Sequence, residues 1–109
     1  MRRTLAGFEN HAGRTILDDG AEPLGRVLAG FGNDGESGYE GCRLDRAIGT
    51  YLHGPLLPRN PWLADWLLAQ AASHCTGEPP PRFEPLPDEL EITAHAVSAA
   101  RARARGGRF

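Results

Sequence analysis

Lysine is absent from this chain of 109 residues, and all twelve of its basic side chains are arginines. Without lysine the chain cannot form the G-x-x-x-x-G-K-[ST] loop that cradles nucleotide phosphates. Long apolar runs are also missing, since no stretch approaches the ~20 apolar residues of a membrane span. The net charge of −2 creates no field that would attract nucleic acid or an anionic membrane. We therefore expect no nucleic-acid partner and no membrane insertion.

Cysteine is scarce, and the two present, Cys42 and Cys75, could form at most one disulfide. The chain opens with no leader-like segment, which predicts a cytoplasmic location where both thiols stay reduced. The four histidines share no metal-ligand spacing, and neither cysteine has a C-x-x-C partner. The sequence thus predicts no metal and no cofactor.

Glycine and proline are plentiful, with 14 and 9 residues respectively, which indicates many turns and few long elements. A domain this small with so many loops buries little surface, so we expect the chain to be part of a larger domain. The predicted fold class is α/β, with several short strands followed by two helices. The predicted strands lie at 4–8, 14–17, 24–32 and within 42–52, with a loop at 33–41.

Asn60 followed by Pro61 predicts a helix start, with the asparagine side chain as N-cap and proline at the first helical position. The apolar stripe of "WLADWLLAQAASH" continues that helix over 62–74. Trp62 and Trp66 lie four residues apart on it, a pattern more typical of a core or subunit contact than of a base-stacking platform.

Asp88 and Glu91 have the spacing of a capping box for a second helix over roughly 89–104. Before it lies a proline-rich segment, and after it a basic end. The predicted organisation is a main unit at 1–75, a connector at 76–87, and a C-terminal helix with a basic tail at 88–109.

His53 directly follows the uncharged run "AIGTYL", and prolines at 55, 58 and 61 restrict the loop after it. A histidine at a strand end is well placed to act as a general base at the carboxyl edge of an α/β sheet. The same position also suits a histidine that only hydrogen-bonds the loop.

A second polar cluster lies in "GFENHAGRT". Arg14 in this cluster could face the carboxylate of a zwitterionic substrate, although such residues are also ordinary turn chemistry. The four candidate residues are Glu9, Asn10, His11 and Arg14.

Neither cysteine has the setting of a catalytic nucleophile. Cys42 lies between a loop and a predicted strand rather than at a sharp strand-to-helix turn. Cys75 lies near a helix C-terminus, where the helix dipole disfavours a thiolate. If His53 is a catalytic base, its nucleophile is not obvious in this chain.

The segments "GFENHAGRT", "PLGRVLAGFGNDG" and "GTYLHGPLLPRNPWLADWLL" occur in this order within about residues 5–70. Together they resemble the C-terminal half of class I glutamine amidotransferases, which have a flavodoxin-like domain. The similarity is to the cobyric acid synthase-like (CobB/CobQ-type) branch, and within it to the amidotransferase subunits of lipid II isoglutaminyl synthases.

The resemblance implies a mechanism in which a cysteine thiolate attacks the amide carbon of glutamine and releases ammonia. His53 matches the histidine that moves protons in this reaction, and the four residues of the second cluster match a motif near the glutamine site. The ammonia would pass to an ATP-dependent, Mur ligase-like subunit of the MurT type. That partner amidates D-glutamate of lipid II in peptidoglycan synthesis.

Two departures from the family pattern qualify this expectation. Many class I amidotransferases carry a glutamate two residues after the histidine, where this chain has Pro55. The N-terminal half with the nucleophile is also missing, so we expect this chain alone not to hydrolyse glutamine. The alternatives are a fragment of a cobyrinate-type amidotransferase and a non-catalytic remnant or interaction module.

Overall fold

The computed structural model describes residues 3–105, and its strands are all short and paired in twos. β1 (Phe8–Glu9) pairs with β6 (Leu52–His53), β2 (Gly25–Arg26) with β3 (Tyr39–Glu40), and β4 (Cys42–Leu44) with β5 (Ala47–Gly49). All three pairs are antiparallel. Three helices follow: α1 (Leu56–Arg59), α2 (Pro61–Thr76) and α3 (Glu89–Ala104). The predicted order of short strands followed by helices is confirmed, but the loop expected after His53 contains an additional short helix, α1.

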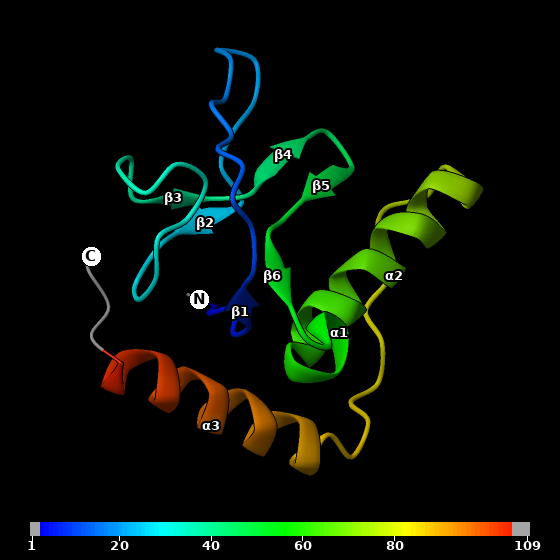
Figure 1. Ribbon diagram of the computed structural model, residues 1–109. Helices are drawn as coiled ribbons and strands as arrows, with labels where there is room; N and C mark the ends of the chain where they lie inside the picture. The colour runs from blue at the N-terminus through cyan, green and yellow to red at the C-terminus, as the bar shows by residue number, and fades with distance from the viewer. Residues whose placement is uncertain (1–2, 106–109) are drawn as a thin grey trace.

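The strand pairs lie together, α2 flanks them on one side, and α3 runs along the end of the molecule near β1 (Figure 1). The His95 ring attaches α3 to the junction between α1 and α2. Its Nδ1 lies 3.0 Å from the Arg59 carbonyl oxygen and 3.1 Å from Asn60 Oδ1. Its Nε2 lies 2.8 Å from the Thr4 hydroxyl, so one imidazole links α3 to two separate segments.

Both long helices lie where the sequence predicts them. α2 has proline at its first position and ends at Gly77, which adopts the left-handed conformation common in helix C-caps. The predicted side-chain caps, however, are wrong: neither Asn60 nor Asp88 caps its helix through its side chain. The Asn60 side chain instead hydrogen-bonds the backbone of Ala6: Oδ1 accepts from the Ala6 amide, and Nδ2 donates to the Ala6 carbonyl.

The strand predictions need several corrections. The predicted strand at 14–17 is absent, and the predicted loop at 33–41 contains β3. Only Phe8 of the predicted strand at 4–8 lies in a strand, and the one at 24–32 is reduced to Gly25–Arg26. The run 47–52, predicted as one strand, is split between β5 and β6, which belong to different pairs. Side chains satisfy many backbone groups in this region, so the backbone does not need long ladders.

The segment 77–88 between α2 and α3 contains no helix or strand. The C-terminal end of the expected basic tail, residues 106–109, lies outside the described residues. Within residues 3–105, no helix is long and apolar enough to cross a lipid bilayer.

Candidate active site

The pairing of β1 with β6 brings the two candidate clusters side by side. Phe8 lies opposite His53, and Glu9 lies opposite Leu52. His53 is the last residue of β6 and its side chain is exposed, as a group that exchanges protons with a substrate must be. The sequence prediction of a histidine at a strand end is therefore confirmed in its position.

The ring of His53 stacks on the ring of Phe8, with the centroids 5.4 Å apart and the planes 23° from parallel. Gly54 follows with φ of +65°, and a side chain at this position would collide with the Phe8 ring. Among residues 3–105, no side chain or backbone group hydrogen-bonds the His53 imidazole. Neither ring nitrogen is thus engaged by this part of the chain.

Glu9 is bound to the backbone of a neighbouring loop. Its carboxylate accepts the Gly32 amide at 2.8 Å and the Phe31 amide at 3.1 Å. These bonds hold the loop after β2 against the end of β1. The carboxylate oxygens therefore already have partners within the protein.

His11 and Asn10 lie just beyond the end of β1. The His11 ring stacks almost parallel on the Tyr51 ring at 3.5 Å, and its Nδ1 lies 2.8 Å from the Gly13 carbonyl oxygen. The Tyr51 hydroxyl in turn lies 2.6 Å from the hydroxyl of Thr15. Asn10 is exposed. Because Tyr51 immediately precedes β6, these contacts connect the second cluster to the segment that carries His53.

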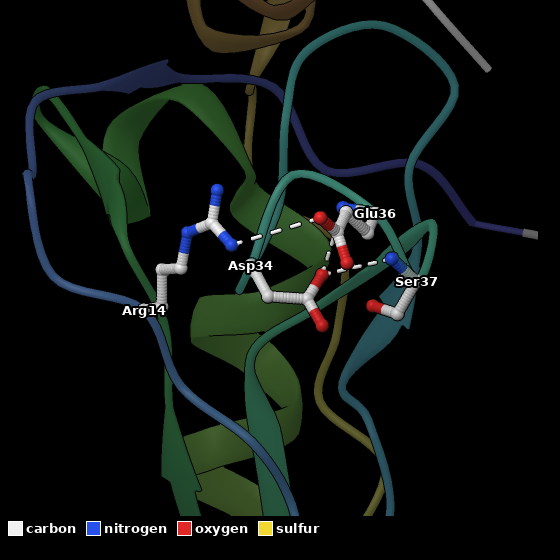
Figure 2. A network of polar contacts seen from close by, with 4 residues as sticks. All are labelled: Arg14, Asp34, Glu36 and Ser37. Atoms are coloured by element: carbon white, nitrogen blue, oxygen red, sulfur yellow. Dashed lines mark hydrogen bonds and ion pairs between the residues drawn. The ribbon is translucent and has the colours of Figure 1, made fainter.

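Arg14 points toward the loop at 33–38, as Figure 2 shows. Its guanidinium lies 3.7 Å from the carboxylate of Glu36, and both side chains are largely exposed. The neighbouring Asp34 accepts the backbone amides of Ser37 at 2.8 Å and Glu36 at 3.0 Å. These bonds, above all the one from Ser37, lower the pKa of Asp34, because they favour the ionised carboxylate.

Glu40 is a residue that the sequence reasoning missed. It is 7% exposed, and its carboxylate accepts the Tyr51 amide at 2.6 Å and the Thr50 hydroxyl at 2.8 Å. It thus fixes the two residues that lead into β6. The only signal in the sequence was a glutamate between two glycine turns, which does not reveal a buried carboxylate.

The remaining candidates lie on other elements. Cys42 is half-buried at the start of β4, and Cys75 is exposed in the last turn of α2. Trp62 donates from Nε1 to the Thr4 carbonyl at 3.0 Å, while the Arg43 guanidinium lies 5.0 Å from the Trp66 ring centre. No group of three or more potential metal ligands occurs in the part of the chain that the structure describes.

Residues 2–61 match the CobB/CobQ-like glutamine amidotransferase domain. This match spans more than half of the chain, so the chain belongs to that family. It is also 46% identical over 91% of its length to subunit GatD of the glutamine-hydrolysing lipid II isoglutaminyl synthase from Staphylococcus aureus (strain N315). The GatD subunit from Streptococcus pneumoniae (strain R6) is 45% identical over 69% of this chain.

A probable cobyric acid synthase from Methanothermobacter thermautotrophicus is 45% identical over 47% of this chain. The chain covers only part of each of these relatives, 39% of the S. aureus subunit and 29% of the S. pneumoniae subunit. The similarity to the GatD subunits extends over more of the chain than the similarity to the cobyric acid synthase.

Proposed function

We propose that this chain is the portion of a glutamine amidotransferase subunit that carries the catalytic histidine, His53. In this proposal, residues 1–75 form the C-terminal part of a flavodoxin-like amidotransferase domain. A cysteine elsewhere in the intact protein gives its thiol proton to the His53 imidazole and attacks the glutamine amide as a thiolate. The imidazolium then protonates the amide nitrogen, which leaves as ammonia. The imidazole then removes a proton from the water that hydrolyses the thioester.

The observation that carries this proposal is the identity of 46% over 91% of the chain to a GatD subunit. Three features of the site agree with the proposed role: His53 is exposed, it ends β6, and within residues 3–105 its imidazole has no hydrogen-bond partner. Asn10, His11 and Arg14 are proposed to contact glutamine, with Arg14 facing its carboxylate. Glu9 is proposed to contribute mainly by holding the loop at 30–32, since its carboxylate accepts two amides there.

The ammonia is proposed to pass, in the cytoplasm, to a Mur ligase-like, ATP-dependent subunit of the MurT type, which amidates D-glutamate of lipid II. The test is to purify the intact amidotransferase that contains this chain together with that ligase. Glutamine-dependent amidation is then measured with lipid II and, separately, with a cobyrinate acceptor. We expect amide formation on lipid II only, and amidation of the corrinoid alone would contradict the proposal.

A further inference from the structure

We infer that Phe8 is the positioning residue of His53, and that an aromatic stack orients the imidazole. This inference rests on the proposed function, because the orientation of His53 affects the reaction only if the imidazole transfers protons there. The Phe8 ring would hold the His53 imidazole in a chain that has Pro55 where many class I amidotransferases carry a glutamate, two residues after the histidine.

The contact is built by the backbone as well as by the two rings. Phe8 and His53 lie directly opposite each other in the β1–β6 pair, which places their side chains on the same face. Their rings are 5.4 Å apart and 23° from parallel, a separation within the range of stacked aromatic pairs. The stack therefore follows from the strand register, and a shift of one residue would separate the rings.

The backbone of Gly54 packs against the Phe8 ring. A Cβ atom at this position would collide with the Phe8 ring, and the φ of +65° is one that side chains rarely adopt. The Phe8 ring thus packs close to the backbone directly after His53. This packing limits the positions that the Phe8 ring can take.

A stack orients the imidazole without occupying its nitrogens. Within the described residues, no hydrogen bond fixes the His53 ring, whereas His95 and His11 are each held through Nδ1. A face-on contact restricts rotation of the imidazole and leaves both nitrogens free to accept and donate protons. An exposed histidine without it would sample several rotamers, and only a fraction of them would align with the reacting atoms.

The test compares Phe8→Leu with Phe8→Tyr in the intact amidotransferase. Phe8→Leu should lower kcat for glutamine hydrolysis roughly 2- to 10-fold, the scale of one lost aromatic pair, and leave KM for glutamine nearly unchanged. Phe8→Tyr keeps the ring and should restore kcat. The matched control is Phe83→Leu, since Phe83 is 47% exposed against 51% for Phe8 and lies in the segment between α2 and α3.

A second readout does not depend on activity. In NMR spectra of histidine-labelled protein, assigned with His53→Ala, the ring protons of His53 should lie upfield because of the Phe8 ring current. That shift should disappear in Phe8→Leu and persist in Phe8→Tyr and Phe83→Leu. The same spectra show whether each variant is folded.

The outcomes separate this inference from the proposed function. If His53→Ala is inactive while Phe8→Leu keeps the wild-type kcat and the same His53 shifts, the positioning role is wrong and the proposed function stands. An active His53→Ala would contradict the proposed function, and with it the role of Phe8. Loss of kcat and of the shift in Phe8→Leu, both recovered in Phe8→Tyr, would support the inference.

Discussion

At the scale of single residues, the candidate site separates into side chains that bind the protein itself and side chains that remain available. Glu9 and Glu40 use their carboxylates on backbone amides, and His11 is stacked on Tyr51. His53 and Arg14 remain exposed, and within residues 3–105 Arg14 forms an ion pair only at the surface, with Glu36. A surface pair of this kind contributes about 0–1 kcal/mol, so Arg14 can exchange it for a ligand at little cost.

We therefore expect Arg14→Ala to weaken glutamine binding and leave stability almost unchanged. The loss of a charge-assisted hydrogen bond to the glutamine carboxylate should raise KM roughly 10-fold, with little change in kcat. Steady-state glutaminase kinetics of the intact protein would measure this. The controls are Arg26→Ala, another exposed arginine, and Glu36→Ala, which removes the ion-pair partner. An unchanged KM in Arg14→Ala would show that Arg14 belongs to the loop and not to the site.

The sequence predicts where the candidate residues lie along the strands and loops better than it predicts which side chains they contact. His53 was placed correctly at a strand end because an uncharged run followed by a glycine-proline turn is a local signal. The stack of His53 on Phe8 joins residues 45 positions apart and depends on the register of the β1–β6 pair. Neither the pairing nor its register can be read from a single sequence. Glu40 and Asn60 were missed as buried anchors for the same reason, since burial of a polar side chain depends on distant backbone groups.

At the scale of elements, the helices and the strands of this chain form for different reasons. α2 and α3 have local signals of start, apolar stripe and end, and both were predicted within two residues of their observed limits. The strands are two or three residues long and are held by side chains rather than by extended ladders. Periodicity cannot predict such strands, because two residues do not form a period.

Asn60 is the clearest case of a side chain that joins two elements. It is fully buried at the start of α2, where Oδ1 accepts the Ala6 amide at 2.7 Å and Nδ2 donates to the Ala6 carbonyl at 2.8 Å. This arrangement imitates a strand pair and ties the segment before β1 to the helix. Nδ2 also lies 2.8 Å from the Leu56 carbonyl of α1.

We expect Asn60→Ala to lower the free energy of unfolding by about 3 kcal/mol, since each buried backbone group left unpaired costs about 1–3 kcal/mol. Urea unfolding followed by circular dichroism would measure the change. The control is Asn10→Ala at an exposed asparagine, for which a change within about 0.5 kcal/mol is expected. Equal effects of the two substitutions would contradict the anchoring role of Asn60.

At the scale of the whole molecule, the candidate active site lies on a chain with a small hydrophobic core. Only four apolar side chains are buried among the described residues, Ala6, Val27, Leu63 and Ala69. The chain spans 39% of the length of the S. aureus relative. The proposed function therefore belongs to the intact amidotransferase, in which His53 and a thiolate are proposed to act together.

The most direct test of the central claim is the rate of glutamine hydrolysis by the intact amidotransferase with His53→Ala. General acid–base catalysis contributes about 10²–10⁴-fold, so kcat should fall by at least about 100-fold, while KM and the folded spectrum are retained. His74→Ala, at an exposed histidine in α2, should keep the wild-type rate. A His53→Ala enzyme with near-normal turnover would contradict the assignment of His53 as the catalytic histidine.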